Sequence, residues 1–532
     1  MRYRAAVESY YPSPALQRFG KMIESPLFYA LLTFLPATIG FLGCVFHRLF
    51  FPISLAYLAA LSAFSLAGIF NSWETSYTLM WIGGIQFSFD QYTYPLLFGT
   101  SFSIFTSLLL FRKFLSHYFY QIALVLLTAL IVSFSAVDLV SIYIALELTG
   151  FCAFLLIADR NDNKSLFLSF QYLIGGGLAM LIYLIGVISA FQFSTTFLIK
   201  DLSYATPIAL CLIVAGLLTK AGIFICGLWV PNIYSHASPQ SSAILAGCVT
   251  CAGIAPIARM SGDLVPIANS LVVIGVLSAV VAALYAVFER DDGRALGWSS
   301  VSQLGLAILS PTYACIYAMQ HGVCKALLFS TLNPEDPATH EHHEKSQHHT
   351  SNSDHQPGLT KFQNYASLIV FVIASLSVMA FPLTSGFITK TLLKGDIPTN
   401  AKIIVSTSTL LTTTVYVRLI WSRIQVFLRK NHDIAINKDV QQIKFKWYFN
   451  QFYLVACAIA IVSFSINNWS VLTYDNIMNS LSATGLGIIL YASVVGLQAV
   501  KIVKPVTRTL DLVGAPFVVA ALLLANLLYF KI

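Results

Sequence analysis

Charged side chains are scarce in this sequence. Only 10% of its 532 residues are Asp, Glu, Lys or Arg, whereas soluble domains carry roughly 25%. This scarcity excludes a chain built of soluble domains. The hydrophobic fraction of 57% and the mean hydropathy of +0.75 indicate many membrane crossings. The sequence therefore predicts an all-α polytopic membrane protein.

The signatures of soluble enzymes are missing as well. There is no Gly-rich phosphate loop, nucleophile elbow or dinucleotide fingerprint, so we expect no cofactor and no resident metal. The nine cysteines lie almost entirely in apolar runs, which favours small buried side chains over disulfides or an iron–sulfur site. The formal charge of +8 lies mostly in loops between apolar runs, so we expect no nucleic-acid partner.

Apolar runs of spanning length occur sixteen times along the chain. Their expected ranges are 26–44, 50–70, 94–111, 119–136, 137–158, 165–191, 206–228, 240–260, 264–288, 294–311, 312–331, 363–395, 401–425, 450–467, 481–501 and 508–530. When the N-terminal arm is counted as the first loop, eighteen lysines and arginines fall in or beside the even-numbered loops and nine in or beside the odd-numbered ones. The positive-inside rule then places both termini on the non-cytoplasmic side, although the basic N-terminal arm argues for the opposite sense.

One loop has an unusual composition. Residues 333–358 contain six histidines among acidic and polar residues, and such a tract cannot pack into a core. We expect a solvated cytoplasmic linker. A divalent-metal or pH-sensing role is the alternative, but no spacing fixes a tetrahedral ligand set.

Five ionisable residues lie inside the predicted spans: Glu147, Lys220, His321, Lys325 and Lys390. A charge at membrane depth costs about 2.5 to 3.5 kcal/mol on insertion scales, so it usually has a function. Each residue also has a plain structural explanation, as a lysine that snorkels from a helix end or a histidine bonded to a neighbouring carbonyl. Facing acid, base and imidazole groups would form a proton relay, because each shifts the pKa of its neighbour.

The segments that carry Lys220 and Lys390 share a second feature. Both contain helix-breaking residues, which are Gly227 and Pro231 in the first segment and Pro382 and Gly386 in the second. In our count they are five spans apart, so corresponding helices would run in opposite directions. This pattern is typical of inverted-repeat transporters, whose broken helices lie near the ion path.

Together these motifs resemble a known family, the antiporter-like membrane subunits of respiratory complex I, its photosynthetic counterpart and the Mrp-type cation/proton antiporters, most closely the Mrp D-type. The resemblance runs from Phe87 to Lys394. It comprises an aspartate-led segment from Asp138 to Leu148 that ends in Glu-Leu, and a helix-seven lysine with a Trp-x-Pro and a Ser-Pro corner (Lys220, Trp229, Pro231, Ser238, Pro239). It continues with a loop motif at Gly293 to Ser302, a His-x-x-x-Lys-Ala-Leu-Leu-Phe motif at His321 to Phe329, and a broken helix twelve (Pro382, Gly386, Phe387, Lys390).

The resemblance implies a fold of about 14 to 16 transmembrane helices with two inverted five-helix repeats and broken helices seven and twelve. We accordingly divide the chain into an N-terminal arm with three helices (1–118), a first repeat (119–260), a second repeat containing the His-rich loop (264–425) and C-terminal helices (426–532). It also implies a proton path through Glu147, Lys220, His321, Lys325 and Lys390, and no redox centre in this subunit.

The sequence departs from the family pattern at the eighth span. The family's central lysine there corresponds to Cys251. A neutral thiol, whose reference pKa is about 8.5, cannot supply a fixed positive charge. In addition, the Pro-Phe-His that precedes the family's tryptophan has become Ile225, Cys226 and Gly227, so that a histidine is lost.

These observations leave three hypotheses. The first is a proton-translocating subunit of a multisubunit cation/proton antiporter or a complex I-like assembly, with other membrane subunits as partners and H⁺ with Na⁺ or K⁺ as the ions. The second is a non-transporting scaffold subunit of such a complex, and the third is a proton-coupling partner in inorganic-carbon uptake. For all three we expect an integral protein of a bacterial cytoplasmic or thylakoid membrane.

Overall fold

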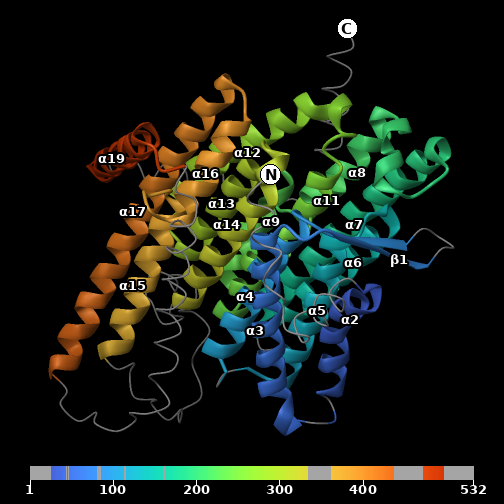
Figure 1. The fold of residues 1–532 in the computed structure, drawn as a ribbon. Helices are drawn as coiled ribbons and strands as arrows, with labels where there is room; N and C mark the ends of the chain where they lie inside the picture. Colours follow the sequence, from blue (N-terminus) through green and yellow to red (C-terminus); the bar gives the residue numbers. More distant parts are fainter. Residues whose placement is uncertain are drawn as a thin grey trace, which may run out of the picture.

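The computed structural model describes residues 25–43, 45, 47–80, 85–112, 115–159, 162–332, 361–436 and 471–496. These ranges form a bundle of helices with one two-stranded antiparallel hairpin (Figure 1). Eight helical segments in them are long and apolar enough to cross a membrane. The prediction of a helical, polytopic membrane protein is therefore confirmed.

The first part of the chain contains the hairpin, which the apolar pattern did not predict. Its elements are α2 (Pro26–Leu42), α3 (His47–Asn71), β1 (Thr75–Met80), β2 (Ile85–Phe89) and α4 (Thr93–Leu110). The hairpin strands pair from Thr75 opposite Phe89 to Met80 opposite Ile85. Phe87 and Phe89 on β2 are buried, so the hairpin packs on the bundle with one face.

The next part corresponds to the predicted first repeat. It comprises α5 (His117–Ser135), α6 (Leu139–Ile157), α7 (Asn163–Ser194), η1 (Ile199–Tyr204), α8 (Pro207–Lys220), η2 (Cys226–Leu228), α9 (Trp229–His236), α10 (Pro239–Gly247), η3 (Val249–Cys251) and α11 (Ile254–Arg259). Local signals start these helices. The Asp138 carboxylate accepts from the Ser141 N–H at 2.7 Å at the start of α6, and proline is the first residue of both α8 and α10.

The following part corresponds to the predicted second repeat and one later helix. It comprises η4 (Val265–Ile267), α12 (Ala268–Phe288), α13 (Asp292–Ala307), α14 (Pro311–Thr331), α15 (Lys361–Val378), α16 (Ser385–Asp396), α17 (Thr399–Ile436) and α19 (Tyr474–Gly496). The predicted spans 450–467 and 508–530, the His-rich tract 333–358 and residues 1–24 lie outside the described residues.

Helix seven breaks earlier than we expected. The predicted run 206–228 ends as a helix at Lys220, and Gly222 follows with φ +66°, the left-handed conformation with which glycine commonly ends a helix. Gly227 lies where a Cβ would come within 2.0 Å of the Gly222 carbonyl oxygen. Pro231, by contrast, is the third residue of α9 and does not interrupt it, because proline is tolerated in a first helical turn.

Helix twelve breaks where we predicted. α15 ends at Val378, and Ala380 follows in the left-handed conformation with φ +62°. Pro382 lies in the turn before α16, and Gly386 lies in the first turn of that helix. A Cβ at Gly386 would be only 1.7 Å from the Ser377 carbonyl oxygen, so the two half-helices touch at this glycine.

A third interruption was not predicted. The span 240–260 is divided into α10 and α11 by the short 3₁₀ turn η3. Cys251 ends that turn. The residue that replaces the family's lysine therefore lies in a helix break of its own.

Helix α14 lies at the centre of the bundle. It packs against α4, α10, α11, α13, α15 and α16, and nearly every residue from Ala314 to Phe329 is buried. This position explains why the helix carries a polar motif without facing lipid, and it brings His321 and Lys325 close to both halves of the chain.

Candidate functional site

Four of the five predicted site residues are almost completely buried. The exposed fraction is 4% for Lys220, 1% for His321, 0% for Lys325 and 3% for Lys390, whereas Glu147 on α6 is partly exposed. Lysines that snorkel to a membrane surface would keep their ammonium groups in water. This explanation is therefore wrong for Lys220, Lys325 and Lys390.

The Lys220 ammonium occupies a space that two glycines leave open. A Cβ placed on Gly150 of α6 would lie 2.7 Å from Lys220 Nζ, and a Cβ placed on Gly176 of α7 would lie 3.3 Å from it. Lys220 is the last residue of α8, where free carbonyl groups and the negative end of the helix dipole favour a cation. The side chain therefore extends from the helix break into the junction of α6, α7 and α8.

Glu147 is the acidic group that interacts electrostatically with Lys220. Each of the two groups acts electrostatically on the other. They do not form a closed ion pair, since the pairs within 4.0 Å among the described residues are Arg259–Asp90 and Arg294–Glu289. Glu147 Oε1 is buried and has no hydrogen-bond partner in the described part of the chain. The carboxylate is thus free to accept a proton.

Cys251 lies in the η3 turn, at the position where the resemblance leads us to expect a lysine. Its exposed fraction is 1%, and its thiol points to two carbonyl oxygens, Gly247 at 3.9 Å and Ala318 of α14 at 3.7 Å. Cys248 precedes it in a Cys-x-x-Cys spacing, so our expectation that the cysteines show no such spacing was wrong. Both thiols are free and buried.

His321, Lys325 and Lys390 form the second group. His321 and Lys325 share one face of α14, and both Lys325 and Lys390 act electrostatically on His321. Among the described residues, His321 Nε2 is a buried ring nitrogen without a hydrogen-bond partner. An imidazole with one open nitrogen beside two amines is a suitable group for receiving and releasing a proton.

The two lysines of this group each bind a backbone carbonyl. Lys325 Nζ donates to the Leu296 carbonyl of α13 at 2.7 Å and lies 5.4 Å from the centroid of the Tyr416 ring. Lys390 Nζ donates to the Val378 carbonyl at 2.9 Å. Since Val378 is the last residue of α15, Lys390 of α16 compensates a free carbonyl at the end of the other half-helix.

Polar residues that sequence reasoning missed surround this second group. Gln320 Nε2 donates to Ser377 Oγ at 3.1 Å, and Ser377 Oγ is 3.0 Å from Ser385 Oγ across the α15–α16 break. Tyr317, also on α14, donates to Gln303 Oε1, and Gln303 Nε2 donates to Thr412 Oγ1. Uncharged polar residues are common at buried helix contacts, so their types alone gave no signal of a site.

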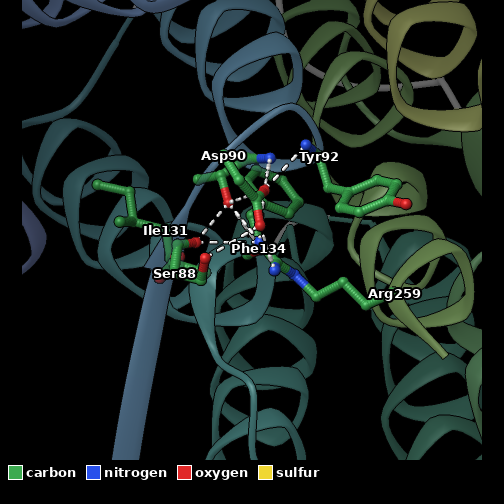
Figure 2. A network of polar contacts seen from close by, with 8 residues as sticks. Ser88, Asp90, Tyr92, Ile131, Phe134 and Arg259 are labelled. Carbon is green, nitrogen blue, oxygen red and sulfur yellow. Dashed lines mark hydrogen bonds and ion pairs between the residues drawn. The ribbon is translucent and has the colours of Figure 1, made fainter. Parts of the chain in front are cut away.

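Arg259 and Asp90 anchor the broken eighth span to the hairpin and α4. Figure 2 shows the Arg259 guanidinium among Asp90, Ser88 and the Phe134 carbonyl, with Nη1 2.6 Å from Asp90 Oδ2. Asp90 also accepts from the Tyr92 and Thr93 N–H groups at the start of α4. The pair is 169 positions apart in sequence, so no local pattern could have predicted it.

One titratable group in a loop beside the site has a shifted pKa. The Asp291 carboxylate accepts from the Arg294 N–H at 2.6 Å and begins α13. Burial, followed by the nearby negative charges of Glu289 and Asp292, raises its pKa to about 6. No cluster of three or more metal-ligating side chains occurs in the described ranges.

Comparison with known proteins identifies the family. Residues 136–414, just over half of the chain, match the family described as NADH:quinone oxidoreductase/Mrp antiporter, TM. The chain belongs to this family. The matched range begins before α6 and ends within α17, so it contains all five predicted site residues and Cys251.

Individual relatives agree with the family. The chain is 27% identical over 225 residues to NADH-quinone oxidoreductase subunit N 2 of Rhizobium meliloti (strain 1021), covering 40% of this chain and 46% of the relative. It is 30% identical over 240 residues to the chloroplastic NAD(P)H-quinone oxidoreductase subunit 5 of Acorus calamus var. americanus, covering 40% and 32%. The matches thus span less than half the length of either relative.

The fold matches a solved complex over most of its length. A chain in the structure of the Mrp complex from Dietzia sp. DQ12-45-1b superposes with a TM-score of 0.64 at 17% identity, covering 88% of this chain and 99% of that chain. At this identity the match shows the fold. Together with the family and the apolar helices, it confirms an integral membrane protein of the antiporter-like type.

Proposed function

We propose that this chain is a proton-translocating subunit of a multisubunit membrane complex, of the Mrp cation/proton antiporter type or a complex I-like type. Protons would move along Glu147, Lys220, His321, Lys325 and Lys390, and Na⁺ or K⁺ would be the exchanged ion in an antiporter. The observation that carries the proposal is the complete burial of three lysines in one membrane chain, two of them at interrupted helices. Such charges are too costly in a membrane to be incidental.

The geometry supports a two-part path. Glu147 and Lys220 act on each other without a closed ion pair, so a small approach or separation changes how strongly each holds its proton. His321, Lys325 and Lys390 form the second part, in which both amines act electrostatically on the imidazole. A proton arriving at either end would displace another by electrostatic repulsion.

The arrangement of elements also supports the proposed internal repeat. Ranges 119–260 and 264–425 each contain five spans, and the fourth of each is interrupted before or after a buried lysine. An inverted repeat would place the two breaks at equivalent depths on either side of α14. We retain the two repeats, the non-cytoplasmic termini and the bacterial or thylakoid membrane as proposals.

Replacing Lys220 by Ala tests this function. We expect cation-dependent proton exchange in inverted membrane vesicles to be lost, because Glu147 then has no cation to act on it, while the partner subunits still copurify. Undiminished exchange in the variant would remove Lys220 from the path.

A scaffold subunit is the second candidate, and Cys251 is the observation that favours it. The Cys251 thiol lies in the η3 break, with the Gly247 and Ala318 carbonyl oxygens as its hydrogen-bond partners among the described residues. A thiol at this position supplies no fixed charge to link the two groups. A Cys251→Lys variant separates the candidates. A faster proton exchange in this variant than in the wild type would indicate a working path with a slow step at position 251. A wild-type protein that shows no exchange but is required for assembly of the complex would indicate a scaffold.

A further inference from the structure

Helices α16, α17 and α19 lie at one edge of the bundle (Figure 1). Residues of all three helices line a large cavity. Its volume is about 1000 Å³, which is the upper size of ordinary ligand pockets. None of the five proposed path residues lines it. Ile403 and Leu486 on its wall are 69% and 54% exposed, so the cavity is open to the surface that faces the membrane.

The polar side chains gather at one end of the cavity. Lys402 and Ser406 line it from the beginning of α17, and Asn476 and Asn479 line it from the beginning of α19. Lys394, near the end of α16, joins them and donates to Ser406 Oγ at 3.1 Å. Because α16 ends and α17 begins here, this end of the cavity lies where the chain turns at the membrane surface.

The charge at this end favours an anion. In the described part of the chain, neither Lys394 nor Lys402 has a carboxylate within 4.0 Å. Asp396 also lines the cavity and accepts from Ser310 Oγ at 2.5 Å. Its single negative charge leaves an excess of positive charge beside the two lysines. Two ammonium groups beside amide and hydroxyl donors can bind the oxygens of a phosphate.

The other end of the cavity is apolar. Leu410 follows Lys402 by eight residues on α17, and Leu486 follows Asn476 by ten residues on α19, which corresponds to about 12 to 15 Å along a helix. The lining therefore changes from cationic to apolar over the distance that separates a lipid headgroup from its acyl chains. A small soluble anion would bind at the cationic end alone and would leave the apolar end without a ligand.

We propose that this cavity binds an anionic phospholipid, with the headgroup phosphate between Lys394 and Lys402 and an acyl chain along Leu410 and Leu486. Lys394 lies one helical turn beyond Lys390 on α16. The bound lipid would therefore hold the end of the half-helix that carries Lys390. The proposal does not depend on which ion the chain moves.

The test uses the full chain in the assembly with which it copurifies, in a mild nonionic detergent. Phosphatidylglycerol is titrated in, and the bound lipid is counted by native mass spectrometry. Since each lysine near an anionic headgroup contributes a factor of about five in affinity, we expect Lys394→Ala and Lys402→Ala each to weaken binding about fivefold. Lys200→Ala, which removes an exposed lysine outside the cavity, should leave binding unchanged.

A second variant keeps the charge and fills the apolar half. Ala483 lines the cavity, and Ala483→Trp should reduce phosphatidylglycerol binding without changing the local charge. Three results would overturn the proposal: an equal loss in the Lys200 variant, equal binding of phosphatidylcholine, or complete displacement of the lipid by inorganic phosphate. The last result would assign the lysines to a soluble anion.

Discussion

Gly150 offers a way to move the Lys220 ammonium without changing any charge. A Cβ at Gly150 would lie 2.7 Å from Nζ, whereas ordinary contacts begin at 3.4 Å, so Gly150→Ala displaces the ammonium by about 0.7 Å. Lys220 Nζ is the end of a flexible side chain, and alanine favours a helix over glycine by about 1 kcal/mol. The variant should therefore fold and assemble.

The expected effect is on transport alone. Because a misplacement of about 1 Å at a reacting group costs on the order of 100-fold, we expect Gly150→Ala to slow proton exchange in inverted vesicles by tenfold to 100-fold. Gly176→Ala, with its 3.3 Å contact, should have a smaller effect. Gly175→Ala, next to Gly176 on α7, is the matched control, since nothing lies within 4 Å of its Cβ. Equal rates for Gly150→Ala and Gly175→Ala would refute the role of the Lys220 position.

Three further predictions concern stability. Ala380→Gly should raise the free energy of unfolding by about 1 kcal/mol, as measured by denaturant titration in detergent, because Ala380 holds a left-handed conformation at φ +62°; unchanged stability would show that the turn carries no strain. Arg259→Leu should cost about 3 to 5 kcal/mol because it leaves the largely buried Asp90 carboxylate without its cation, and Asp90→Asn in the same chain should recover part of this loss. Asp291 has a folded-state pKa of about 6, above its ordinary 3.8, so folding binds a proton in that interval and the melting temperature should fall as pH rises from about 4 to 6. Asp291→Asn keeps an acceptor at the start of α13 and should flatten this slope, whereas an unchanged slope would assign it to other groups.

Within the described residues, membrane-spanning helices could be predicted from the sequence because apolar runs had the length of a membrane crossing. The division between α5 and α6 was found although only residues 136–138 separate these helices. The hairpin was missed because its strands, Thr75–Met80 and Ile85–Phe89, are shorter than a span and alternate in polarity. Gly83 and Gly84 between them were the available turn signal.

The sequence predicted which two lysine-bearing spans are broken, but it placed the break in helix seven at the wrong residues. Proline was given too much weight at Pro231, where it fits a first turn, and Gly222 was overlooked although a left-handed glycine is a common helix end. The break at Cys251 lies between two glycines that we did not weigh as a signal, Gly247 at the end of α10 and Gly253 just before α11. The η3 turn of this break packs against α14.

The candidate residues could be found from the sequence because charged residues are rare in apolar runs. The residues that surround them in the fold could not be predicted. Nothing local indicates that Gly150 and Gly176 leave room for Lys220, or that Lys390 reaches the Val378 carbonyl. These contacts join different helices, and an apolar run carries no information about its partners. The Arg259–Asp90 pair was missed for the same reason.

The most direct test of the central claim is proton flux through the assembled complex in sealed proteoliposomes, with either end of the path removed. Glu147→Gln and Lys390→Met change opposite ends and should each abolish cation-driven acidification, because the groups act in series. The double variant should be no slower than either single variant. Wild-type flux in either single variant would contradict a continuous path from Glu147 to Lys390.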